Sequence, residues 1–182
     1  MTLANKLTLG RIGCVPFFIV FLFTFGRAGK TIAFLIFIFA SFSDLLDGWL
    51  ARRRNEVTSL GKIVDPVADK ILVYSAFISF IQLHLVPFWM VIIIMGRDLL
   101  VMALRIELAA KNFILSANKL AKLKTFFESI VIFFIFFTLV WEGFKNKIWG
   151  ADIMTCLLMG IATLLALVSG IQYWIESKGY LK

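Results

Sequence analysis

Long apolar stretches separated by short polar segments run along the whole chain. A membrane-spanning helix needs about 20 predominantly apolar residues, because the hydrocarbon core of a bilayer is about 30 Å thick. On this measure the pattern predicts six spanning helices, at 7–25, 31–51, 63–83, 86–106, 124–141 and 150–174. No internal repeat or linker marks a second domain. We therefore expect an all-α integral membrane protein, a six-transmembrane-helix bundle formed by a single domain over residues 1–182.

The composition supports this expectation. Hydrophobic residues make up 61% of the 182 residues and charged residues only 16%, whereas soluble domains are about 45–50% apolar and about 25% charged. A water-soluble globular domain is excluded, and so is a disordered chain, which needs low hydrophobicity. The two cysteines, Cys14 and Cys156, lie in apolar runs without metal-ligand spacing, and we expect them to be buried free thiols.

The charges are unevenly distributed. The chain has 19 basic and 11 acidic residues, a net charge of +8. With six spans, both termini lie on one side of the membrane, and that side carries every basic residue except Arg27, Lys30, Lys145 and Lys147. Basic residues concentrate in cytoplasmic loops, so the predicted topology is N-in/C-in. In a membrane protein such a positive excess indicates contact with anionic lipid headgroups, and we expect no nucleic-acid partner.

Four aspartates lie near the cytoplasmic ends of the second and third predicted spans. Asp44 and Asp47 are three residues apart, and Asp65 and Asp69 are four apart, so each pair shares one helix face. If the two helices are neighbours, the four negative charges repel one another unless several are protonated or cations lie among them. Oxygen ligands favour Mg²⁺ or Mn²⁺, and two divalent ions would balance the charge. The only histidine, His84, is expected at the opposite end of the third span, which argues against zinc.

Small and basic residues between these aspartates complete a longer pattern, Asp44-x2-Asp47-Gly48-x2-Ala51-Arg52-x8-Gly61-x3-Asp65-x3-Asp69. At all eight positions it resembles the signature of the CDP-alcohol phosphatidyltransferase family. The resemblance implies a six-helix bundle, usually a homodimer, with a polar cavity facing the cytoplasm. In this cavity two divalent metals hold the pyrophosphate of a CDP-linked lipid while an alcohol attacks it.

The resemblance also implies roles for single residues. The expected metal ligands are Asp44, Asp47, Asp65 and Asp69. Asp69 would in addition take the proton from the attacking hydroxyl. The residues expected to bind the CDP-linked lipid are Asp47, Gly48, Ala51, Arg52 and Gly61, with Arg52 at the phosphate of the nucleotide.

Basic residues in the fourth and fifth spans bear on the acceptor alcohol. Arg97 and Arg105 are eight residues apart and so lie on one face of a helix, and Lys122 and Lys124 lie at the start of the fifth span. Guanidinium groups bind phosphate through two parallel hydrogen bonds, so these four residues predict a phosphorylated acceptor.

Further segments are similar to the bacterial members of the family whose acceptor is sn-glycerol 3-phosphate. They are Asn5-x-Leu7-Thr8-x2-Arg11, GRDLLVMALR at 96–105 and KLAKLKT at 119–125. The similarity implies that CDP-diacylglycerol and sn-glycerol 3-phosphate give phosphatidylglycerol phosphate and CMP at the bacterial inner membrane, with the acceptor phosphate held at Arg97, Arg105 and Lys122. Thr8 and Arg11 are possible further contributors at the cytoplasmic mouth. The chain departs from those members at Gly96 and Asp98, where they usually have Ala and Glu, and at Ala121, where they usually have Gly.

Several alternatives remain open on the sequence. Arg97 could pair structurally with Asp98 or Glu107 instead of binding a ligand. The acceptor pocket could serve an inositol-phosphate-forming or a cardiolipin-forming transferase of the same family. A small transporter with an acidic intramembrane site would also contain six helices and buried charges, although aspartates clustered at one cytoplasmic edge form no path across the bilayer. An inactive interaction subunit is a third alternative, and the intact set of aspartates argues against it.

Overall fold

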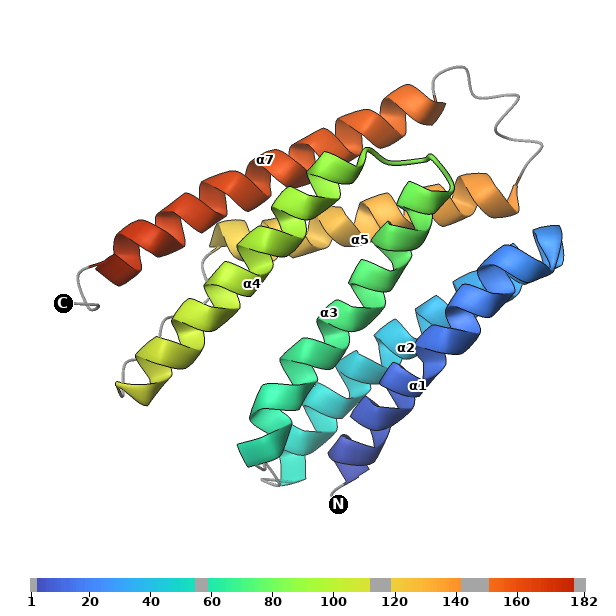
Figure 1. Ribbon diagram of the computed structural model, residues 1–182. Coiled ribbons are helices and arrows are strands. Elements are labelled where there is room, and N and C mark those ends of the chain that lie inside the picture. The colour runs from blue at the N-terminus through green and yellow to red at the C-terminus, as the bar shows by residue number, and fades with distance from the viewer. Residues whose placement is uncertain (1–2, 55–58, 112–118, 142–150, 179–182) are drawn as a thin grey trace. The chain divides into compact units, whose positions relative to one another are not determined.

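The computed structural model describes residues 3–54, 59–111, 119–141 and 151–178. These residues form six helices and no strand (Figure 1). The helices are α1 (Leu3–Thr24), α2 (Gly26–Arg54), α3 (Ser59–Gln82), α4 (Phe88–Ala110), α5 (Lys119–Val140) and α7 (Ala151–Lys178). Each overlaps one of the six predicted segments, so the expectation of an all-helical fold is confirmed for the residues that the structure describes.

The junction of α1 and α2 differs from the prediction, which placed five residues between these helices. Only Phe25 separates them, because Gly26 adopts a positive φ of 53° that turns the chain sharply. The backbone N–H of Gly29 then donates to the carbonyl oxygen of Phe25 at 3.1 Å. A Cβ at Gly29 would collide with the carbonyl oxygen of Phe21, so a glycine is needed where α2 starts beside α1.

The described helices group into two compact units, which are described separately. The first is Met1–Ser79 with Leu139–Glu142. In it α1 packs along α2, with the Phe18 and Phe37 rings 6.2 Å apart in a fully enclosed apolar contact. Buried Ala33 and Ala40 on α2 allow the two backbones to approach closely, as small residues do between membrane helices.

The second unit is Phe80–Thr138 with Gly143–Lys182, and within it α4 packs along α7. Buried Ile94 and Leu108 on α4 and Ala162 and Ala166 on α7 contribute to its core. Phe80, at the end of α3, meets Phe136 of α5 edge to face at 5.2 Å. This unit contains every described residue of the predicted acceptor site.

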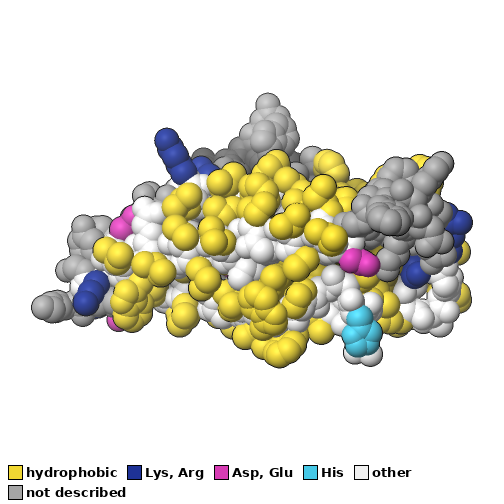
Figure 2. Space-filling model, turned by 90° about the horizontal axis from the view of Figure 1, so that it is seen from above, with side chains coloured by type: hydrophobic (Ala, Val, Ile, Leu, Met, Phe, Trp, Pro, Cys, Tyr) yellow, Lys and Arg dark blue, Asp and Glu magenta, His cyan; other side chains and the backbone are white. Residues whose placement is uncertain are grey.

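Three of the six described helices contain a segment that is apolar enough for a membrane span. Among the described residues, three helical segments are long and apolar enough to cross a bilayer: Gly26–Ser43, Lys119–Val140 and Asp152–Lys178. Hydrophobic side chains cover much of the surface seen in Figure 2. The expectation that Cys156 is buried is wrong, because this free thiol lies on the exposed apolar side of α7 among Ile153 and Leu157; Cys14 is half-buried.

Candidate active site

The aspartate pattern lies on the C-terminal end of α2 and the N-terminal end of α3, which follow each other in the sequence. Asp44 and Asp47 belong to α2, and Asp65 and Asp69 belong to α3. Both pairs are inside regular helix, so the three- and four-residue spacings do place each pair on one helix face. The segment 55–58 that joins the helices spans at most about 18 Å, which keeps their ends near each other.

The side chains of this pattern lie outside the described residues. This holds for the four aspartates and for Gly48, Ala51, Arg52, Gly61 and Thr8. No group of three or more histidine, cysteine, aspartate or glutamate side chains that could hold a metal occurs among the side chains that are described. The donor set itself suits the expected ions, since four carboxylates supply only hard oxygen ligands of the kind that Mg²⁺ and Mn²⁺ prefer.

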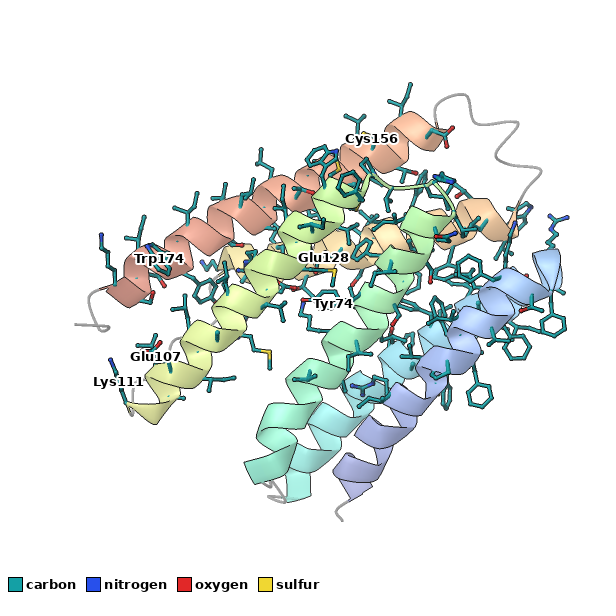
Figure 3. All side chains as sticks on the ribbon, in the orientation of Figure 1. Tyr74, Glu107, Lys111, Glu128, Cys156 and Trp174 are labelled. Carbon is teal, nitrogen blue, oxygen red and sulfur yellow. The ribbon has the colours of Figure 1, made fainter. Side chains whose placement is uncertain are left out.

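A buried ion cluster joins α4 to α5. The Lys124 ammonium lies 2.5 Å from Oδ1 of Asp98 and 2.6 Å from Oε1 of Glu128, and the three side chains are 1%, 4% and 2% exposed. Figure 3 labels Glu128 on α5. Lys124, predicted to bind the acceptor phosphate, therefore has two carboxylates as its immediate neighbours. Neither Asp98 nor Glu128 was predicted as a site residue.

Arg97 joins this cluster through one side of its guanidinium. Its Nη1 donates to Oδ1 of Asp98 at 3.1 Å, and the side chain is 11% exposed. Pairing with Asp98, one of the alternatives left open by the sequence, therefore occurs, whereas Glu107 lies towards the far end of α4 beside Lys111 (Figure 3). The Nε and Nη2 atoms of Arg97 are buried and have no hydrogen-bond partner among the described residues.

Tyr173 of α7 brings the two predicted arginines together. Its hydroxyl accepts a hydrogen bond of 2.5 Å from Nη2 of Arg105. The guanidinium carbons of Arg97 and Arg105 lie 5.4 Å and 5.1 Å from the centre of its ring, within the range of cation–π attraction. Because both arginines reach one side chain, the expectation that they share a face of α4 holds.

Sequence reasoning missed Tyr173, although α7 carried a signal. Ser169, Tyr173 and Ser177 are spaced by four residues in a largely apolar helix, and all three are buried. Polar groups on one face of a membrane helix normally point into the protein rather than into lipid. This periodicity would have identified the face of α7 that meets α4.

Two further predicted residues are described, one on α5 and one on α1. Lys122 is exposed on α5, two residues from buried Lys124. Arg11 of α1 is buried, and its Nε donates to the carbonyl oxygen of Ala40 on α2 at 3.2 Å. Arg11 therefore contributes to the contact between α1 and α2, and its predicted role at the cytoplasmic mouth stays a prediction.

Comparison with known proteins defines the class of this chain. Residues 1–176 match the CDP-alcohol phosphatidyltransferase family, and the chain belongs to this family. The resemblance carried by the aspartate pattern is thereby confirmed.

Individual relatives extend over most of the chain. It is 39% identical over 142 residues to CDP-diacylglycerol–glycerol-3-phosphate 3-phosphatidyltransferase of Bacillus subtilis, covering 71% of this chain and 74% of that protein. It is 33% identical over 179 residues to the protein of the same name from Rickettsia typhi, covering 98% of both. A probable phosphatidylglycerophosphate synthase of Mycobacterium tuberculosis is 35% identical over 174 residues, or 94% of this chain and 79% of that protein.

Proposed function

We propose that this protein transfers the phosphatidyl group of CDP-diacylglycerol to sn-glycerol 3-phosphate, giving phosphatidylglycerol phosphate and CMP. The observation that carries the proposal is the convergence of Arg97 and Arg105 on Tyr173. Two guanidiniums on one apolar helix that both contact the same side chain suit a dianionic phosphate, whereas a neutral alcohol needs no positive charge for its binding. The names of the relatives agree with this acceptor.

We assign the acceptor phosphate to Arg97, Arg105 and Lys122. The buried Nε–Nη2 edge of Arg97 presents two parallel donors, which is the geometry that two oxygens of one phosphate accept. Lys122 is exposed and lies about 200° around α5 from Lys124, so its place in this set rests on the resemblance and not on a described contact. Lys124 stays in the assigned set. It contacts Asp98, which in turn contacts Arg97, and it also contacts Glu128. Lys124 therefore helps to orient Arg97 for the phosphate, in addition to any contact of its own with the ligand.

The aspartates carry the other half of the proposal. Asp44, Asp47, Asp65 and Asp69 would hold two Mg²⁺ or Mn²⁺ ions, which would neutralise the pyrophosphate of the CDP-linked lipid. Asp69 accepts the proton of the 1-hydroxyl of glycerol 3-phosphate. That hydroxyl oxygen bonds to the phosphorus that carries diacylglycerol, and the bond from this phosphorus to the oxygen of CMP breaks. CDP-linked lipid binding is assigned to Asp47, Gly48, Ala51, Arg52 and Gly61.

The membrane arrangement belongs to the same proposal. Six spans with N-in/C-in topology are supported by six helices among the described residues and by basic residues concentrated on one side. α2 is 29 residues long, roughly 44 Å, so it exceeds a hydrocarbon core of about 30 Å and would extend past it. We assign the protein to the bacterial inner membrane as a homodimer, with the active site on the cytoplasmic side.

Release of CMP from CDP-diacylglycerol by the purified protein tests the proposal. In detergent with Mg²⁺, CMP should appear when glycerol 3-phosphate is added and not when inositol phosphate, phosphatidylglycerol or no acceptor is added. Release with inositol phosphate or phosphatidylglycerol alone would instead identify another transferase of the family. No release with any acceptor, from protein that binds CDP-diacylglycerol, would contradict transferase activity.

A further inference from the structure

We propose that Gly170 and Tyr173 of α7 are positioning residues that hold Arg97 and Arg105 in the geometry that binds the acceptor phosphate. The inference rests on the proposed function, because it concerns how the two arginines are arranged for that ligand. It assigns a role to α7, a helix on which the sequence predicted no site residue.

Tyr173 holds both arginines without neutralising them. Arg97 and Arg105 are eight residues apart, about 12 Å along α4, yet both guanidinium carbons lie within 5.4 Å of one ring centre. The ring is 1% exposed and the hydroxyl accepts from Arg105. A carboxylate in this position would add a second negative partner beside Asp98, which already accepts from Arg97, and would reduce the charge available to an anionic ligand. A phenol fixes their orientation by cation–π attraction and a hydrogen bond, and leaves their positive charge in place.

Gly170 makes room for the side chain of Arg97. It precedes Tyr173 by three residues, so both lie on the same face of α7. A Cβ at Gly170 would lie 2.9 Å from Cγ of Arg97 and 3.8 Å from its Nε. Cγ belongs to the stem of the side chain, so any larger residue would displace the whole arginine. The absence of a side chain at Gly170 and the ring of Tyr173 therefore define one cradle for Arg97.

The cradle leaves one edge of Arg97 for a ligand. Asp98 accepts from Nη1, while Nε and Nη2 are buried and have no partner among the residues that the structure describes. Buried donors without partners are unfavourable, and an oxyanion would satisfy both at once. With Asp98 on one side and α7 on another, the guanidinium is oriented before the ligand arrives.

Removing the Tyr173 hydroxyl gives the first test. Y173F keeps the ring and loses the acceptor for Arg105. It should raise the apparent KM for glycerol 3-phosphate about tenfold, since hydrogen bonds to charged groups contribute on this scale. The KM for CDP-diacylglycerol and kcat should stay within about twofold of the wild type. Inorganic phosphate, used as a competitive inhibitor against glycerol 3-phosphate, should lose affinity by the same factor. Y173L, which also removes the ring, should have the larger effect on both constants.

Two variants of α7 serve as matched controls. T163V removes another buried hydroxyl, which donates to the carbonyl oxygen of Met159 in the same helix, and should leave the KM for glycerol 3-phosphate unchanged. G160A adds a methyl group where a Cβ meets nothing within 4 Å, whereas G170A adds it against Arg97. G170A should raise the KM for glycerol 3-phosphate, and G160A should not.

The outcomes separate this inference from the proposed function. If the wild-type protein does not use glycerol 3-phosphate, the proposed function fails. If it does, an unchanged KM for glycerol 3-phosphate in both Y173F and G170A overturns the inference alone. An equal rise in KM for both substrates, or a fall in kcat alone, means a general structural role and also overturns it. If Y173L does not fold, Y173F and G170A still decide.

Discussion

Replacing Lys124 by methionine tests the buried ion cluster. Methionine has a similar length and keeps the apolar stem, but it removes the ammonium that lies 2.5 Å from Asp98 and 2.6 Å from Glu128. Two carboxylates, 4% and 2% exposed, then lose a positive neighbour in a medium where water cannot replace it. We expect K124M to be clearly less stable than the wild type.

The expected size follows from the burial. Removing one partner of a buried ion pair costs about 3–5 kcal/mol, because the other charge loses a positive neighbour; here the loss falls mainly on Glu128, since Asp98 keeps Arg97 at 3.1 Å. For a chain of this length, 1 kcal/mol changes the unfolding midpoint by about 2–4 °C, so the midpoint should fall by roughly 6–20 °C. The double variant K124M/E128M removes one of the two carboxylates as well, and we expect it to be at least about 1 kcal/mol more stable than K124M.

Denaturation followed by circular dichroism in detergent measures both effects. K119M is the matched control, since Lys119 is exposed on the same helix and its replacement should change stability by no more than about 0.5 kcal/mol. If K124M is as stable as K119M, the cluster does not stabilise the fold. If the effects of K124M and E128M simply add, the two side chains are not coupled, and the reasoning from their contact is wrong.

Three further predictions concern the reaction. D69N should lower kcat by about 10²–10⁴-fold, the contribution of a general base, with its unfolding midpoint within a few degrees of the wild type; full activity would exclude Asp69 as the base. Chelation with EDTA should abolish CMP release and added Mg²⁺ or Mn²⁺ should restore it, whereas activity that persists in the chelator would contradict the metal assignment. R105A should raise the KM for glycerol 3-phosphate more than that for CDP-diacylglycerol, and an equal rise for both would mean that Arg105 acts on the fold.

Hydropathy alone located the helices, because each helix is a long apolar stretch and short polar segments separate one stretch from the next. It misplaced the start of α2, since a two-helix turn at Gly26 depends on one backbone angle and on the close approach of Gly29 to α1. The aspartate pattern could be recognised from the sequence alone, because the two aspartates of each pair lie within one helix and their spacing is fixed by helix geometry.

The surroundings of the basic residues could not be predicted in the same way. Lys122 and Lys124 are two residues apart, which is about 200° around α5, so their side chains lie on opposite sides of the helix. Which of them is buried depends on the partners across the helix, Asp98 and Glu128, and not on α5 alone. Tyr173 likewise resembles an interfacial aromatic residue until the face of α7 that meets α4 is known.

The partners of the charges on α4 have a consequence for the biogenesis of the protein. α5 contains both Lys124 and Glu128, so it can enter the membrane with these two charges already paired. α4 is made earlier, but Asp98 meets Lys124 only when α5 exists, and Arg97 and Arg105 meet Tyr173 only when α7 does. Unpaired charges are costly at membrane depth. α4 therefore acquires its partners on α5 and α7 only after these helices have been synthesised: Lys124 adds a positive charge beside Asp98, whereas Tyr173 orients the two arginines without changing their charge.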